Sequence, residues 1–249
     1  MSWLSSTQFR PPVGFTIFAA VGVGILWTLC GWQLGRRAEA LVEREVYATR
    51  LSAPAFDAVS PPENPEYRRV QASGTPDWLH VQRVIGRYMW SQPGMQLLLP
   101  LRLKSGIVVL VDIGWVPEDD ADAILEREAK SGSTRTFTGM ARPFSNEPDA
   151  RLTDDAMGRP RWRSIAPAAM GEAIGVPVPN WVVIDGQGLT EDEDIPDRVP
   201  PVSGWRLAPV ERPHGEYAFT WFSLGMTLLM VWLSLSFTVR APNGLSARS

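Results

Sequence analysis

Residues 13–34 read VGFTIFAAVGVGILWTLCGWQL and residues 217–239 read YAFTWFSLGMTLLMVWLSLSFTV, and neither stretch contains a charged side chain. As helices with a rise of about 1.5 Å per residue, both would be roughly 33 Å long. The hydrocarbon core of a bilayer is about 30 Å thick. Aromatic residues such as Trp27 and Trp232 suit positions at or near the membrane surfaces. The two stretches therefore predict two transmembrane helices.

The charged residues lie almost entirely between these two stretches. All 27 acidic residues and 21 of the 24 basic residues fall within residues 35–216, which gives this middle part a formal charge of −6. This distribution predicts one sizeable extramembrane domain and argues against a nucleic-acid partner, which would favour a basic surface. One cysteine and two histidines exclude an internal disulfide framework and a zinc site built from Cys and His.

The two tails, residues 1–12 and 240–249, indicate the orientation of the predicted spans in the membrane. Both tails lack acids and carry arginine. Positive tails favour the cytoplasm, although Arg36 and Arg37 act in the opposite direction. We therefore expect a two-span protein of the bacterial inner membrane with a periplasmic domain, or of the mitochondrial inner membrane in a eukaryote. A cleaved signal peptide is the alternative for the first stretch, but its apolar run exceeds the usual length of about 7–15 residues.

The middle part begins with a helical stem and a proline-rich linker, residues 35–66, followed by a β-rich domain, residues 67–216. Lys104-Ser105-Gly106 separates two apolar runs and predicts a hairpin turn. Many short strands and few helices predict an α+β domain that is partly closed as a sheet or barrel. The predicted strands are 68–73, 79–90, 96–103, 107–111, 134–141 and 181–185, and the predicted short helices are 121–130 and 167–174.

Three motifs occur in order along the chain. Gly31-Trp32-Gln33-Leu34 precedes Arg36; residues 94–101 read GMQLLLPL and residues 109–117 read VLVDIGWVP; residues 214–222 read HGEYAFTWF. Together with the two-span layout, these motifs resemble the Surfeit locus protein 1 family, membrane factors for cytochrome c oxidase assembly. The resemblance implies a role in haem a handling and an oxidase subunit as partner, with the haem-bearing catalytic subunit as the expected one.

The chain departs from the family pattern at three places, as a divergent bacterial-type member would. The family usually has Asn-Arg-Gly-aromatic where this chain has Asp112-Ile113-Gly114-Trp115. Asparagines often precede the family's histidine, whereas Arg212-Pro213 precede His214 here. A lysine common after the first motif corresponds to Ala40.

His214 is the sharpest candidate for a functional side chain. A neutral imidazole is a good axial ligand for haem iron, and the resemblance to the family implies that this histidine handles haem a. If a helix has begun by His214, Tyr217 at i+3 and Trp221 at i+7 share its face and could line a porphyrin. The alternative is an interfacial histidine that is hydrogen-bonded to backbone or solvent.

Trp32, Gln33, Arg36 and Arg37 are expected at the same membrane face as His214. Gln33 could hydrogen-bond a partner helix or a haem propionate, and Arg36 or Arg37 could pair with propionates. The alternatives are that Trp32 and Gln33 anchor the helix in the membrane interface and that the arginines are ordinary flanking charges.

Three functions remain open, of which a non-enzymatic assembly factor that binds haem, an oxidase subunit or both transiently is favoured. A cofactor-free scaffold for a half-built oxidase shares every feature except the need for His214. A membrane-anchored enzyme has little support, since the sequence has neither a Gly-x-Ser-x-Gly elbow nor a phosphate loop. Cys30 and His80 are expected to be structural, and the acidic run 191–194 to be a solvated loop.

Overall fold

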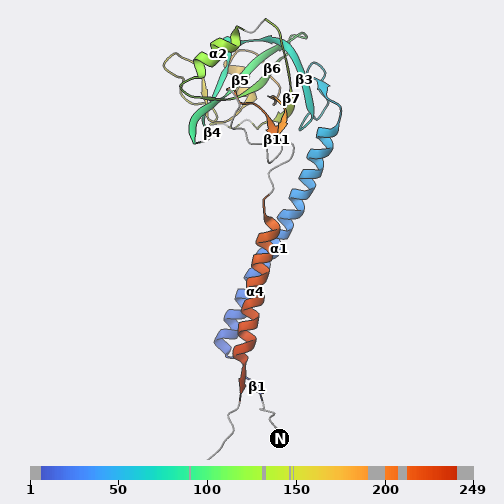
Figure 1. Ribbon diagram of the computed structural model, residues 1–249, viewed down its shortest axis with the longest axis vertical. Coiled ribbons are helices and arrows are strands. Elements are labelled where there is room, and N and C mark those ends of the chain that lie inside the picture. The colour runs from blue at the N-terminus through green and yellow to red at the C-terminus, as the bar shows by residue number, and fades with distance from the viewer. Residues whose placement is uncertain are drawn as a thin grey trace, which may run out of the picture. The chain divides into compact units, whose positions relative to one another are not determined.

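The computed structural model describes residues 7–89, 91–130, 133–145, 147, 149–189, 200–206 and 212–239. The chain forms two compact units (Figure 1). One unit, the helix pair, consists of Met1–Glu43 and Glu211–Ser249. The other, the β domain, consists of Arg44–Val210. The predicted combination of two long apolar helices with a β-rich domain is confirmed.

The β domain is built on a mixed eight-stranded sheet with the order β2-β3-β7-β9-β6-β5-β4-β8. Because β3 also pairs with β5, the strands β3, β7, β9, β6 and β5 close into a barrel, as the sequence predicted. The strands are β2 (Phe56–Asp57), β3 (Arg69–Pro76), β4 (Gln82–Met89), β5 (Gln92–Leu103), β6 (Val108–Pro117), β7 (Arg135–Pro143), β8 (Arg161–Trp162) and β9 (Trp181–Asp185). A short parallel pair, β10 (Gly188–Leu189) and β11 (Trp205–Arg206), lies outside this sheet.

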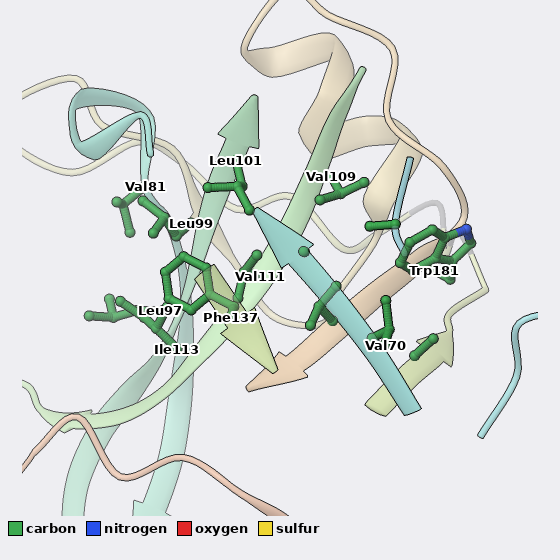
Figure 2. Packing of buried hydrophobic residues seen from close by; sticks show 14 of the residues in the cluster. Val70, Val81, Leu97, Leu99, Leu101, Val109, Val111, Ile113, Phe137 and Trp181 are labelled. Carbon is green, nitrogen blue, oxygen red and sulfur yellow. The ribbon is translucent and has the colours of Figure 1, made fainter. Parts of the chain in front are cut away.

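The barrel interior is filled by alternate residues of its strands, as Figure 2 shows. Val109, Val111 and Ile113 of β6 point to the same side and pack with Leu97 and Leu99 of β5. Successive side chains of a strand point to opposite faces, so an apolar residue at every second position is enough to fill one face. In β6, however, every residue is buried, which is typical of a strand that is covered on both sides.

A second apolar cluster covers the outer face of β6. Leu110 packs with Trp162 and with Met170 of the short helix α3 (Pro167–Ala173). The Trp162 Nε1–H donates a hydrogen bond of 2.9 Å to Oε1 of Gln82, and both side chains are fully buried. A buried indole N–H needs such a partner, so this bond satisfies the polar atoms of the cluster. The other helix of the domain, α2 (Ala121–Ala129), contributes Ile124 and Leu125 to the interior cluster.

The structure corrects several boundaries. The proline-rich linker contains strand β2, and its residues Phe56 and Ala58 are buried in the barrel interior, because apolar side chains between the prolines can still pack. Trp78–His80 forms a 3-10 turn (η1) instead of the start of a strand. The predicted strand 107–111 extends to Pro117 as β6. The acidic run 191–194 lies outside the described residues.

Glycine is required at position 114, where the segment after β10 crosses the end of β6. Gly114 has a φ of +114°, and a Cβ there would lie 2.4 Å from the carbonyl oxygen of Val202. Val202 is held by two backbone hydrogen bonds to Trp115, of 2.9 and 2.8 Å. The side-chain-free position therefore allows this segment to pack directly on β6.

Replacement of Gly114 by alanine is expected to destabilise the β domain by about 2–3 kcal/mol, because it adds a steric contact to an unfavourable φ. Gly106 is the matched control, since it also has a positive φ of +87° but has open space around the Cβ position. Gly106→Ala is expected to cost about 1 kcal/mol. Chemical denaturation of both variants measures the difference, and equal losses would show that the Val202 contact contributes nothing.

The helix pair consists of α1 (Val13–Ser52), which contributes its residues up to Glu43, and α4 (His214–Ser236). Both helices are long and apolar enough to cross a membrane, and only 11% of each apolar window is buried. A core helix of a soluble protein would be mostly buried, so the exposure favours membrane spans. The second helix begins three residues earlier than predicted, because a helix can start before its charge-free run.

Small residues and aromatic rings join α1 and α4, which run side by side (Figure 1). A Cβ at Gly225 would lie 2.6 Å from Nε1 of Trp27, and the Trp27 ring stacks on Phe222 at a centroid distance of 6.3 Å. The Trp232 Nε1–H donates a hydrogen bond of 2.9 Å to the Thr16 hydroxyl. Small residues that admit a large neighbour are a common packing device in membranes.

The helix pair ends in a short antiparallel β ladder. Strand β1 (Thr7–Phe9) pairs with β12 (Phe237–Val239), so the last three residues of the predicted second span are extended. The Phe9 ring lies against both Phe237 and Trp232, at centroid distances of 5.4 and 6.0 Å. The ladder therefore fixes the two helix ends to each other.

Candidate functional site

His214 and Gln33 meet where α4 begins. Nδ1 of His214 lies 2.9 Å from Oε1 of Gln33, and Gln33 is only 8% exposed. Because an amide oxygen accepts, Nδ1 is the donor in this arrangement, and in the neutral ring Nε2 then holds the lone pair. Within the described part of the chain, Nε2 has no hydrogen-bond partner. The imidazole is thus oriented by one nitrogen and available at the other.

The same unit has a polar pocket of about 500 Å³, which is lined by chain neighbours of His214 and by one residue of α1. Its walls are Arg37, Arg212, Pro213, Gly215 and Glu216. Nη1 of Arg37 lies 3.0 Å from the position that a Cβ of Gly215 would occupy. The absence of a side chain at Gly215 therefore lets the Arg37 guanidinium lie against the first turn of α4.

Arg36 points elsewhere. Its Nη1 donates to Oε2 of Glu39 at 2.6 Å, and both side chains are largely exposed. Helical spacing alone does not separate the two, since Arg36 and Arg37 lie three and four residues after Gln33 and both border its face; their contacts do, because Arg36 is held by Glu39 and Arg37 lies against Gly215. The arginine next to α4 is Arg37, whereas the sequence placed Arg36 among the candidate haem-binding residues.

Two of the three aromatic candidates, Tyr217 and Trp32, are exposed, and Trp221 is partly buried. Because α4 begins at His214, Tyr217 and Trp221 lie on one stripe of the helix with it. Tyr217 is 53% exposed and Trp32 is 57% exposed, and the structure records no ring stacking for either among the described residues. Trp27, which the sequence suggested only as an interfacial ring, packs against Phe222 and Gly225 of α4 while it stays 43% exposed.

The β domain contains a buried carboxyl group that the sequence presented only as a departure from the family pattern. Asp112 is 1% exposed; its Oδ1 accepts from the Gly114 N–H at 3.0 Å and its Oδ2 from Nε2 of Gln96 at 2.5 Å. Burial raises the pKa of Asp112 to about 7, against the lowering effect of these two hydrogen bonds. The signal in the sequence was an acid within an otherwise apolar strand.

Other titratable side chains of the β domain form surface ion pairs. Oδ1 of Asp122 accepts from Arg83 at 3.3 Å and from Arg159 at 2.7 Å. Backbone and side-chain hydrogen bonds from Arg159 hold the pKa of Asp155 at about 2. His80 pairs with Asp77 at 2.8 Å and is exposed. Among the described residues, no group of three His, Cys, Asp or Glu side chains could hold a metal ion.

Comparison with known proteins agrees with this architecture. The model of the SURF1 family matches residues 20–226, which covers most of α1, the β domain and the first half of α4. The chain is similar to a SURF1-like protein of Rickettsia bellii (strain RML369-C), with 26% identity over 232 residues, 90% of this chain and 91% of that protein. A SURF1-like protein of Rickettsia conorii (strain ATCC VR-613 / Malish 7) is 23% identical over 234 residues, 91% of this chain and 90% of that protein. The chain therefore belongs to the SURF1 family.

Proposed function

We propose that this protein assists the assembly of a haem–copper cytochrome c oxidase by transiently holding haem a for the catalytic subunit. Membership of the SURF1 family implies a role in cytochrome oxidase assembly, and the family is one of assembly factors. The family and the two candidate spans also support a membrane protein. Our proposal adds to this role the identity of the cargo, haem a, and of its recipient, the catalytic subunit.

The observation that carries the proposal is the hydrogen bond between His214 and Gln33. Metal-ligating histidines almost always donate their second N–H to an acceptor that fixes the ring and its tautomer. Gln33 supplies that acceptor at 2.9 Å, and it leaves Nε2 of His214 with its lone pair. A neutral imidazole prepared in this way fits an axial position on haem iron.

The surroundings of this pair also fit a porphyrin. Tyr217 and Trp221 lie on the His214 stripe of α4, and Trp32 is exposed next to Gln33. Flat rings at the membrane interface offer an apolar surface to a flat ligand while they remain in contact with the headgroup region. Haem a would be cargo here, held by the protein until an oxidase subunit takes it.

We further infer the setting from the charge pattern. Tails without acids favour the cytoplasm, which would place the helix ends with His214 and Gln33 at the periplasmic face of the bacterial inner membrane. The haem-bearing oxidase subunit is the expected partner, since the exposed residues of both helices could contact a neighbouring membrane protein.

A cofactor-free scaffold remains the second candidate, and the same contact supports it. The hydrogen bond between His214 and Gln33 joins α1 to α4, so its contribution could be purely structural. In that case His214 would stabilise the helix pair, and the protein would hold an oxidase intermediate through its surfaces alone.

Complementation of a deletion strain tests the proposal. Deletion is expected to lower the haem a content and activity of the oxidase, and the wild-type gene to restore both. His214→Ala is expected to leave haem a content low while the variant accumulates in the membrane. Full restoration by His214→Ala would favour the scaffold, and normal oxidase in the deletion strain would contradict both functions.

Gln33→Leu is expected to weaken haem binding about 10- to 100-fold, the usual effect of removing the acceptor behind a ligating histidine. Gln33→Glu supplies an acceptor of the same length and is expected to retain binding. Titration of each purified variant with haem a, followed by absorbance, measures the affinities. Equal affinities for Gln33→Leu and the wild type would show that Gln33 does not position His214.

A further inference from the structure

The pocket beside His214 contains two guanidinium groups, contributed by the two helices of the same unit. Arg37 comes from α1 and Arg212 directly precedes α4, and both line the pocket of about 500 Å³. Across the described residues, neither arginine forms an ion pair with an acid. Glu216 also lines the pocket, and it too forms no ion pair there.

Several other arginines among the described residues do form ion pairs with acids. Arg36 is paired with Glu39, Arg50 with Glu66 and Arg159 with Asp122 and Asp155. Two cations and one acid around a single pocket leave a positive excess that a bound anion would offset. A guanidinium presents a planar fork of N–H donors that matches a carboxylate.

We propose that Arg37 and Arg212 bind the two propionate carboxylates of the haem, so that the pocket selects porphyrins whose propionates are free. This inference rests on the proposed function. Arg37 lies one helical turn after Gln33, and Arg212 lies two residues before His214, so each arginine is close along the chain to one member of the candidate ligand pair. Glycine at position 215 leaves room for Arg37 at the pocket, because a side chain there would displace the Arg37 guanidinium.

The guanidinium of Arg212 is a stronger donor for carboxylates than the amide of an asparagine would be. The sequence presented this position as a departure whose consequence was open. In the structure it brings a second positive charge to the pocket that Arg37 already lines.

The test compares free and esterified propionates. The full chain is purified and reconstituted in nanodiscs of phosphatidylcholine, which carries no net charge. It is then titrated with protohaem and with protohaem dimethyl ester, and binding is followed by the Soret band. The wild type is expected to bind the ester at least about 10-fold more weakly, since charge-assisted hydrogen bonds to two carboxylates are lost.

Arg37→Gln and Arg212→Gln are each expected to weaken protohaem binding about 10-fold, and the double variant to bind acid and ester equally. The Soret position is expected to stay unchanged, because His214 still ligates the iron. Arg36→Gln is the matched control, since Arg36 lies on α1 but pairs with Glu39, and its affinity for protohaem is expected to equal that of the wild type.

Equal wild-type affinities for acid and ester would overturn the inference while leaving haem binding by His214 intact. Failure of the wild type to bind either form, and haem a in a parallel titration, would overturn the proposed function and this inference together. Because the ester comparison uses the unaltered chain, it decides the question even if an arginine variant misfolds. A third outcome, loss of co-purified phosphatidylglycerol from the arginine variants with no change in haem affinity, would assign the pocket to lipid headgroups and overturn the inference.

Discussion

Replacement of Asp112 by asparagine is expected to raise the free energy of unfolding by about 4 kcal/mol at pH 8 and by about 2 kcal/mol at pH 5. The carboxyl group is fully buried between β5 and β6, and its pKa is raised from 3.8 to about 7. Because the folded-state pKa lies above the unfolded one, the folded protein binds the proton more tightly. The contribution of this proton to the free energy of unfolding is therefore fully present below about pH 4 and is lost as the pH rises to about 7.

Asparagine removes this cost because it carries no charge at any pH. Its Oδ1 can still accept from the Gly114 N–H, and Gln96 can turn its amide to offer oxygen to the new Nδ2. Denaturant unfolding of the full chain in detergent, repeated between pH 5 and pH 9, measures the effect. The exposed Asp119→Asn is the control and is expected to change stability by less than about 0.5 kcal/mol at every pH. A gain for Asp112→Asn that does not depend on pH would contradict a raised pKa.

His214→Ala is expected to lower the affinity of the purified protein for haem a by at least about 100-fold and to abolish the Soret shift of the bound form. The alanine removes the iron ligand itself, so the loss should exceed the roughly 10- to 100-fold effect expected for its support, Gln33. Titration with haem a, monitored by absorbance, gives both quantities.

His80→Ala is the matched control, because the chain has only two histidines. His80 pairs with Asp77 on the surface of the β domain, so its loss is expected to leave haem affinity unchanged. Equal losses for the two variants would indicate non-specific binding through exposed imidazoles. Unchanged affinity in His214→Ala would contradict ligation by His214.

Much of the fold could be predicted because its signals are local. The spans follow from runs without charge, and β6 and β9 follow from short apolar runs. The sequence predicted a partly closed sheet or barrel but not which strands close it, since closure requires β3 to pair with both β5 and β7, which follow it at different distances along the chain. The burial of Phe56 was missed because prolines around it indicated a linker.

The candidate site was predictable as a set of residues but not as a set of contacts. His214 and Gln33 are distant in sequence, and only the packing of α1 against α4 brings them to 2.9 Å. The choice of Arg37 over Arg36 could not be made from helical spacing, because both lie within one turn after Gln33 and only the Arg36–Glu39 ion pair and the contact of Arg37 with Gly215 separate them. Arg212 carried no periodic signal, and its place in the pocket depends on where α4 begins.

The most direct test of the account is the absorbance spectrum of the protein purified from cells that make haem a. Prepared in parallel, the wild type is expected to carry haem a with the spectrum of a histidine-ligated iron, and His214→Ala is expected to be free of haem. A folded wild-type protein without haem, or a His214→Ala variant with the wild-type spectrum, would contradict the claim that His214, oriented by Gln33, holds haem during oxidase assembly.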